Sequence, residues 1–457
     1  MFIERLHSLL LSGWKDVFSQ ERTLHRAIEH AVATPCSLGR RTISRTICVL
    51  DRHQQDWSAD YKIFSRSKWN QDGLFSPVIP SYLKRYRKGP VPVGLDDTKI
   101  PKSSRKIKSV FWQRDPMSPP FHANLILAQR FIQASVLFPH YQDGDYDARS
   151  IPVRFREATA LKKPGKRASV AEQNQYNKAK KYFNLSTQTL EVIYDIRSEI
   201  DVAGGSDRRM LSVLDGSFCN QTIFRADLDR IDLIARCRKD AKLCMPARHG
   251  ERRKYSTEKF TPEQIRKDET IPWKKTKVRF GGKTRKIRYK QVIGLLWQRG
   301  AGLKHLRLIV IAPQPYKLSP HSRTNYRQPA YLLSTDCISS AKVLIQGYLD
   351  RWQIEVNLRD EKSILGVGQA QVHSENSVPR HPAFVVASYS MMLLASIEKF
   401  GPKRTDDFVE LPKWRKNAKR PSVLDLITLL RKEINETHIP QYLNKNFPKN
   451  LVNYAYT

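Results

Sequence analysis

Short apolar runs of strand length alternate along this chain with stretches of helical periodicity. A buried strand is typically a continuous apolar run, whereas a helix repeats its apolar residues at intervals of three and four. Alternation of the two patterns predicts an α/β fold built around a sheet. The expected strands are 91–95, 109–112, 123–127, 210–214, 231–237, 306–311 and 331–333.

Helical periodicity dominates both ends of the chain and recurs between the strands. Pro90 and Pro92 mark the end of the first helical part. A helix capped by Thr335 or Asp336 is expected to end near Gly366. Prolines at 379 and 382 are expected to separate that helix from the next. The remaining expected helices are one that follows residues 162–181 and runs towards Ile200, an apolar helix at 383–399 and an amphipathic helix at 422–436.

These boundaries divide the chain into five parts. We expect a helical DNA-binding region, the first part of a catalytic core, a basic β-rich insertion, the second part of the core, and a basic linker with a C-terminal helix. Their ranges are 1–88, 89–238, 239–304, 305–400 and 401–457.

The insertion contains a basic hairpin pattern. Apolar and basic residues alternate from Lys277 to Tyr289 around Gly281-Gly282. A Gly-Gly pair between alternating segments is typical of a tight hairpin turn. A charge run is usually a solvated face, but basic and aromatic residues alternating on paired strands favour contact with DNA.

The net charge of +36, from 80 Lys and Arg against 44 Asp and Glu, points to a polyanionic partner. Nucleic acid fits this excess better than a membrane surface, because no polybasic segment adjoins a lipid-inserting helix. The longest apolar stretch, 383–397, is short for a membrane span and is expected to be a buried helix. A hydrophobic content of 40% excludes wholesale disorder. The sequence predicts a soluble, cytoplasmic protein with reduced cysteines.

Three acidic residues have a context that suits catalysis. Asp97 and Asp215 each follow an apolar run, and Glu355 lies on the expected helix after a third. Carboxylates at strand ends converge at one sheet edge, where three of them can hold two metal ions about 3.5–4 Å apart for attack on a phosphodiester. Asp97 and Asp215 could instead be turn residues, and Glu355 could simply pair with Arg351 and Arg359.

Glu355 belongs to a regular pattern of polar residues. Tyr348, Arg351, Glu355 and Lys362 follow one another at intervals of three, four and seven residues. At 3.6 residues per turn these intervals place all four on one face of a single helix, over roughly 21 Å. A carboxylate flanked by two cations can hold a metal ion beside bound phosphates.

At these residues the chain resembles the DDE transposases of bacterial insertion sequences, and in particular the subgroup with the Tyr-x2-Arg-x3-Glu-x6-Lys signature. Asp96-Asp97-Thr98 resembles the first catalytic block of that subgroup, and Leu214-Asp215-Gly216-Ser217 resembles the second. The resemblance covers about residues 90–400 in order and spacing.

The resemblance implies an RNase H-like core with a β-rich insertion domain. It implies that Asp97, Asp215 and Glu355 bind two Mg²⁺ ions, for which Mn²⁺ can substitute. Asp96 is the alternative first ligand, and the Asp-Thr pairing favours Asp97. The other implied contacts with DNA are phosphate binding by Tyr348, Arg351 and Lys362 and insertion of Trp297 or Trp273 into the space of a flipped base.

The implied activity is cut-and-paste transposition, with cleavage at element ends, a hairpin intermediate and strand transfer into target DNA. The expected assembly is a synaptic dimer on double-stranded DNA, in the bacterial cytoplasm at the nucleoid and not at a membrane. A nuclease that cleaves without joining and a non-catalytic DNA-binding derivative remain the alternatives.

Overall fold

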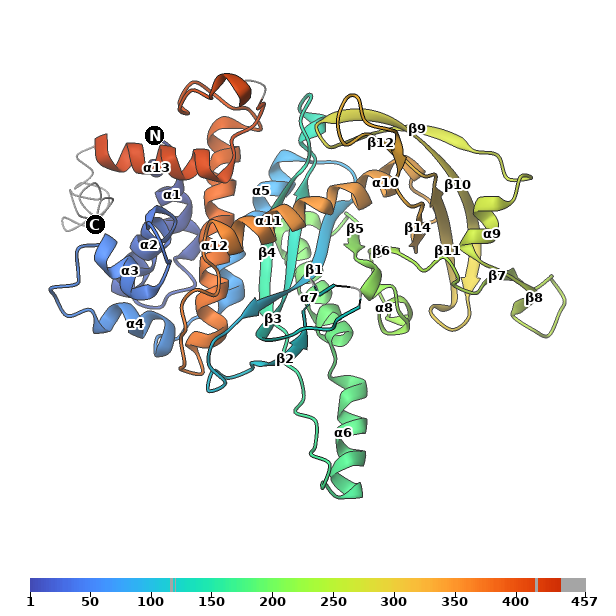
Figure 1. The fold of residues 1–457 in the computed structure, drawn as a ribbon, viewed down its shortest axis with the longest axis horizontal. Coiled ribbons are helices and arrows are strands. Elements are labelled where there is room, and N and C mark those ends of the chain that lie inside the picture. Colours follow the sequence, from blue (N-terminus) through green and yellow to red (C-terminus); the bar gives the residue numbers. More distant parts are fainter. Residues whose placement is uncertain (116–117, 120, 416–417, 437–457) are drawn as a thin grey trace.

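Most of the chain forms one mixed α/β structure (Figure 1). The computed structural model describes residues 1–115, 118–119, 121–415 and 418–436. The strands of the large sheet are β1 (Val91–Pro101), β2 (Phe111–Arg114), β3 (Leu125–Phe138), β4 (Arg149–Glu157), β5 (Met210–Leu214), β6 (Ile231–Arg236), β7 (Leu243–Pro246), β8 (Tyr255–Phe260), β9 (Lys274–Phe280), β10 (Lys283–Trp297), β11 (Gly302–Ile311) and β14 (Ala330–Ser334). The expected α/β class is therefore confirmed.

The sheet runs in the order β2-β3-β1-β5-β6-β14-β11-β10-β7-β8, with β4 also paired to β3 and β9 to β10. The short strands β12 (Pro315–Tyr316) and β13 (Asn325–Tyr326) form a separate pair. Each of the seven expected ranges overlaps a strand, although β2 begins at Phe111 and β3 continues to Phe138, well beyond the expected 123–127. The strand β4 was not expected, because Arg149, Arg154, Arg156 and Pro152 interrupt its apolar pattern.

Parallel pairing brings the ends of three strands together. Strand β5 pairs in parallel with β1 and with β6, and Leu214 lies opposite both Leu95 and Ala235. Asp96 directly follows Leu95, and Asp215 directly follows Leu214, its partner across the two strands. This register is what brings two acidic positions to the same edge of the sheet.

Strand β1 is longer than the sequence suggests. It was expected to end at Asp96-Asp97-Thr98, yet it continues antiparallel to β3 as far as Pro101. The reason is the partner: β3 extends from Leu125 to Phe138 and supplies a backbone ladder for these polar residues. Consecutive residues of a strand point to opposite faces, so Asp96 and Asp97 point apart.

Helices cover the sheet and form the end of the molecule that holds the N-terminus (Figure 1). Those of the N-terminal part are α1 (Phe2–Trp14), α2 (Glu21–Cys36), α3 (Ile43–Val49), α4 (Ser58–Ser65) and α5 (Val78–Arg85). The others are α6 (Val170–Tyr182), α7 (Leu185–Ile200), α8 (Gln221–Arg225), α9 (Pro262–Lys267), α10 (Ala341–Asp350), α11 (Trp352–Ser363), α12 (Ser377–Phe400) and α13 (Val423–Glu436).

The helix α12 is the core of this helical end. Its Phe384 ring lies 5.4 Å from the ring of Trp14 and 5.2 Å from that of Phe64, between ring centres. Contrary to expectation, the prolines at 379 and 382 do not separate it from the preceding segment but lie inside it. Among the described residues, α12 is the one helix long and apolar enough to cross a membrane, but 83% of its apolar window is buried within the fold. It is the buried helix that the sequence predicts.

The basic hairpin forms as predicted, from β9 and β10. Its turn residues Gly281 and Gly282 have φ angles of 60° and 76°, which favour glycine at both positions. Beyond the turn, β10 continues to Trp297 and pairs with β11. The expected insertion at 239–304 thus shares one continuous sheet with the core.

Candidate active site

The polar pattern from Tyr348 to Lys362 lies on two adjoining helices instead of one. α10 ends at Asp350 and α11 begins at Trp352, with Arg351 at the junction. The N-cap of α10 is Ser340, which corrects the expected cap at Thr335 or Asp336. The break is slight, because Arg351 keeps helical backbone angles of −52° and −31°.

Gly347 allows α10 to lie close against the sheet. A Cβ atom at this position would stand 3.2 Å from Leu211 Cδ2 of β5. Gly94 of β1 has the same role for α11, since a Cβ atom there would come within 2.5 Å of Ile354 Cδ1. These two glycines set the distance between the helices and the strand ends that carry Asp96 and Asp215.

Arg351 lies at the centre of the site, among three carboxylates. Its Nη1 is 2.7 Å from Asp96 Oδ2 and 3.9 Å from Glu355 Oε1, and its Nη2 is 3.4 Å from Asp215 Oδ1. The Arg351 side chain is 9% exposed, whereas those of Asp215 and Glu355 are 42% and 43% exposed. Two of the three carboxylates thus face solvent, whereas the guanidinium between them is buried.

Asp97, the expected first member of this group, is not part of it. Its Oδ2 accepts a hydrogen bond from Arg130 Nε at 2.7 Å, on the other face of β1. Asp96, and not Asp97, is the residue of this pair whose side chain reaches Arg351, because β1 remains a strand here and alternates its side chains. The informative signal in the sequence was Gly94, which lies on the strand face that packs against α11. Asp96, two residues further along the strand, lies on the same face.

The site is electrostatically strained by its own carboxylates. Burial raises the pKa of Asp96 to about 7, Arg351 opposes this rise, and Glu355 and Asp215 add to it. Burial lowers the pKa of Lys362, and the charges of Glu361, Glu355 and Asp96 act against that lowering. Burial also raises the pKa of Tyr348, which lies in the field of Arg351. Lys362 therefore lies in the field of Asp96 and Glu355, and Tyr348 lies in the field of Arg351 and Asp215.

The described residues contain no ready-made cluster of three acidic, histidine or cysteine ligands for a metal ion. Arg351 stands between the carboxylates instead. The donor set itself consists of carboxylate oxygens, which Mg²⁺ and Mn²⁺ prefer. Arg351 Nε is buried and has no hydrogen-bond partner in the described structure. The chemistry of Asp96, Asp215 and Glu355 therefore fits a divalent cation, provided that the Arg351 side chain shifts.

A cationic cavity adjoins this group. It has a volume of about 650 Å³ and begins at Gly216, directly after Asp215. Such a lining suits a phosphate-bearing chain next to the carboxylates. The basic residues around it are Arg236, Arg238, Lys239 and Arg266, of which Arg266 is paired with Glu263 in the same lining.

The two tryptophans expected to contact DNA make contacts within the protein in this structure. Trp297, at the end of β10, packs edge-on against Phe224 with 5.7 Å between ring centres. It also covers Gly300, where a Cβ atom would come within 2.1 Å of the ring. Trp273 lies beside Arg288 and Lys290, with the Lys290 ammonium 4.8 Å from its ring centre. In this conformation Trp297 is a packing residue.

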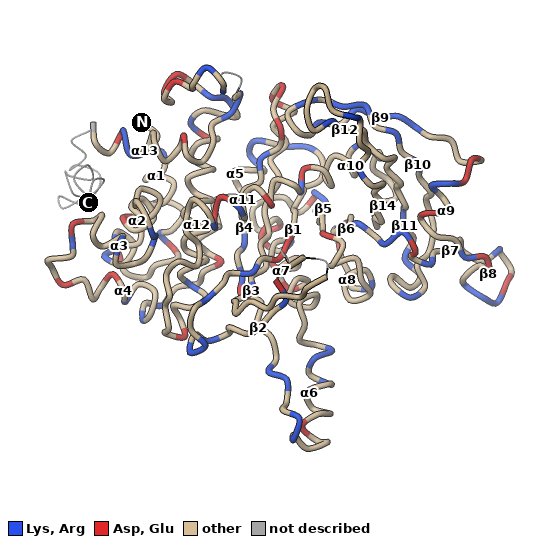
Figure 2. The backbone as a smooth tube through the Cα atoms, in the orientation of Figure 1, with Lys and Arg blue, Asp and Glu red and all other residues tan. Residues whose placement is uncertain are grey.

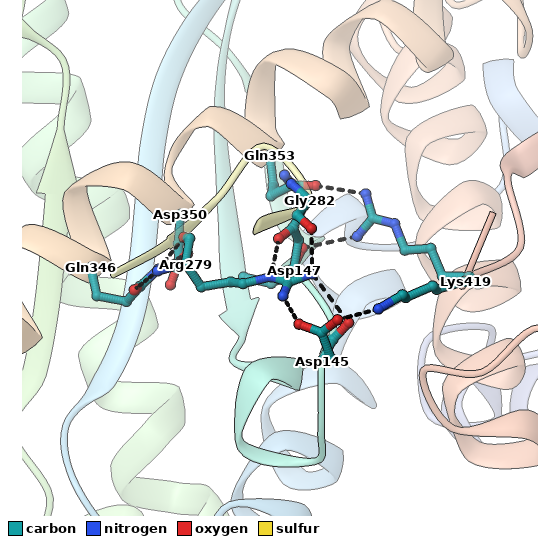
Figure 3. Close-up of polar contacts among 10 residues, drawn as sticks. Asp145, Asp147, Arg279, Gly282, Gln346, Asp350, Gln353 and Lys419 are labelled. Atoms are coloured by element: carbon teal, nitrogen blue, oxygen red, sulfur yellow. Dashed lines mark hydrogen bonds and ion pairs between the residues drawn. The ribbon is translucent and has the colours of Figure 1, made fainter. Parts of the chain in front are cut away.

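A second polar cluster, which the sequence did not reveal, fastens the hairpin to α10 (Figure 3). Gln346 of α10 accepts a hydrogen bond from the backbone N–H of Arg279 and donates one to its carbonyl, both at 2.8 Å. Arg279 Nε donates to Asp147 at 2.7 Å, and its Nη1 pairs with Asp145, which also binds Lys419. We call Asp145, Asp147, Arg279, Gln346 and Lys419 the hairpin anchor.

The hairpin anchor could not be found from sequence because its members are far apart in the chain and follow no periodic pattern.

No protein-family model matches this chain, and neither does any curated protein. The site is therefore interpreted from its own geometry.

Proposed function

We propose that this protein is a DNA transposase with an RNase H-like core, which cleaves element ends and joins them to target DNA. The observation that carries the proposal is the convergence of Asp96, Asp215 and Glu355, from two strand ends and a helix, around Arg351. The strand order β4-β3-β1-β5-β6, with antiparallel pairing followed by parallel pairing, is compatible with that core.

The proposal assigns the metal ligands to Asp96, Asp215 and Glu355, with Asp96 in place of Asp97. Two Mg²⁺ ions held there would activate the attacking water or 3′-hydroxyl and stabilise the leaving oxygen. Arg351 and Lys362 bind non-bridging phosphate oxygens, and the phenol of Tyr348 adds a hydrogen bond to the same backbone.

The chain's own residues also orient the reaction. Arg351 is buried at the helix junction, so a phosphate that it binds after its side chain has shifted away from the metal ligands would lie beside the two exposed carboxylates. Positioning of this kind and neutralisation of charge make up most of the catalysis of phosphoryl transfer. One site can serve cleavage and joining, because both are attacks of a hydroxyl on a phosphodiester.

The expected partner is double-stranded DNA, bound by two copies that bring the two element ends together. A net charge of +36 supports the choice of partner. Binding should weaken steeply between about 50 and 200 mM salt, as counterion release requires. Affinity that did not change with salt would contradict this part of the proposal.

The test is strand transfer of a labelled, pre-cleaved element end into plasmid DNA with Mg²⁺. We expect joined product from the wild type, its loss in Asp96→Asn, Asp215→Asn and Glu355→Gln, and its retention in Asp97→Asn. Cleavage without joining would identify a nuclease instead. DNA binding with no cleavage or joining would identify a non-catalytic derivative.

A further inference from the structure

The helix α6 projects from the body of the protein beyond α7 (Figure 1). It has 13 residues, Val170 to Tyr182, and none of them is buried. A helix of this length is marginal in water without tertiary packing. A capping box at its start, in which Ser169 and Glu172 exchange hydrogen bonds, supplies part of its stability. An exposed helix that the body does not support calls for a binding role.

The arm formed by residues 161–182, which comprises α6 and the segment leading into it, is strongly basic, as Figure 2 shows. Glu172 is its single carboxylate, and it is engaged in the capping box. Among the described residues, no carboxylate forms an ion pair with a lysine or arginine of this arm. The cations are Lys162, Lys163, Lys166, Arg167, Lys178, Lys180 and Lys181.

One exposed face of α6 carries two asparagines and two lysines. Asn174, Asn177, Lys178 and Lys181 have the spacing i, i+3, i+4 and i+7, which places them in one stripe. All four are exposed. Asparagine side chains can pair with adenine through two hydrogen bonds, and lysines bind phosphate or guanine. Glu172, the one repulsive group, lies on the opposite side of the helix.

We propose that the arm 161–182 is a DNA-contacting element whose helix α6 lies in the major groove, with Asn174 and Asn177 at base edges and Lys178 and Lys181 toward phosphates. The groove is roughly 12 Å wide and admits one α-helix. α6 is roughly 20 Å long, enough to follow the groove for several base pairs. A second copy of this chain is a poor occupant for the stripe, since each copy carries +36. This inference rests on the proposed function only in taking DNA as the partner.

The first test compares backbone amide hydrogen exchange in the full-length protein with and without a 40-base-pair duplex of mixed sequence. Residues 170–182 should exchange fast in the free protein, because no tertiary packing protects them. Bound DNA should slow their exchange at least tenfold. Unchanged exchange at 170–182, with protection elsewhere in the chain, would overturn the arm and leave the transposase proposal standing. Absence of any binding to the duplex would overturn the transposase proposal itself.

The second test separates the arm from general charge. Lys178→Ala combined with Lys181→Ala should reduce the slope of log affinity against log salt by about 2, close to 0.9 for each phosphate contact. The matched control, Lys399→Ala with Lys403→Ala, removes the same charge from exposed positions near the end of α12. Its slope should equal that of the wild type. Equal losses in the two double variants would overturn the arm.

The third test addresses base contact. Asn174→Ala with Asn177→Ala should reduce several-fold the ratio of affinities for an A·T duplex and a G·C duplex. Gln175→Ala, an exposed residue outside the stripe, is the control and should leave that ratio unchanged. Alanine favours the helix more than asparagine does, so loss of α6 itself cannot produce this result. An unchanged ratio in the double variant would contradict placement of the stripe at base edges.

Discussion

Arg351 and Arg279 each lie beside at least two aspartates, and their side chains are 9% and 8% exposed. Arg279 uses all of its nitrogens: Nε and Nη1 donate to Asp147 and Asp145, and Nη2 donates to two backbone carbonyls. Arg351 leaves its Nε without a partner in the described structure, and three carboxylates surround it. In the hairpin anchor every nitrogen of the arginine is engaged within the protein, whereas the candidate active site keeps one unpartnered donor and two solvent-exposed carboxylates.

Charge balance and exposure distinguish an ion-pair cluster that holds the fold together from one that can bind a ligand. In the anchor, Lys419 adds a cation to the aspartates, so charge is balanced. In the candidate site, the carboxylates outnumber the cations that contact them, and two of them face solvent. An excess of exposed carboxylate is what a divalent cation would neutralise.

The largest effect is expected in the candidate site. Asp96→Asn or Glu355→Gln should lower the rate of strand transfer by more than roughly 100-fold, the upper end of what loss of a mere outer-shell partner costs. Thermal unfolding should hardly change, because neither variant changes the side-chain volume. The rate is measured with labelled ends at saturating Mg²⁺. Activity near that of the wild type in Asp96→Asn would remove Asp96 from the group of ligands.

Substitutions in the hairpin anchor should lower the stability of the protein, in contrast to those in the candidate site, which should lower its activity. Arg279→Ala removes charged hydrogen bonds at a buried position and should lower the free energy of unfolding by about 2 kcal/mol. Asp145 is 61% exposed and contributes little of this. Urea unfolding of the variant and the wild type measures the change. Lys419→Ala is the matched control at the exposed edge of the anchor, and its effect should stay below about 1 kcal/mol.

A pH dependence should come from Asp350, which accepts a hydrogen bond from Gln346 at 2.8 Å. Burial raises its pKa from 3.8 to about 8, so the folded state holds a proton that the unfolded state has lost. Stability from this group is then present below about pH 4 and declines as the pH rises toward about 8. Asp350→Asn should remove that decline, with a gain of at most about 4 kcal/mol at pH 8 relative to pH 5. Parallel stability curves for the variant and the wild type would contradict it.

The smallest effect is expected at Asp97. Asp97→Asn should retain strand transfer within about threefold, because its partner Arg130 lies on the opposite face of β1 from Arg351. Its ion pair is partly exposed and should be worth less than about 1 kcal/mol. A loss of activity as large as that in Asp96→Asn would mean that the two faces of β1 exchange roles when DNA binds.

The sequence predicted the parts of this fold that follow a local rule. Apolar runs located all seven expected strands, and Gly281-Gly282 located the hairpin turn. The side chain of Asp97 lies outside the group around Arg351 for a reason that the local sequence does not contain, because a strand boundary depends on its partner: only the length of β3 shows that β1 continues past Asp97. Gln346 and Arg279 were missed since side-chain to backbone pairing across the fold follows no period.

The first helix of the chain packs against the last two helices, so it cannot reach its final packing until nearly the whole chain has been synthesised. The backbone N–H of Phe2 donates to Glu433, 431 residues further along the chain, and Trp14 rests on Phe384 of α12. At a synthesis rate of roughly 5–20 residues per second, the first helices wait roughly 20–90 s on the ribosome before their packing partners emerge. During that interval their apolar faces are uncovered, so the nascent chain should depend on chaperones.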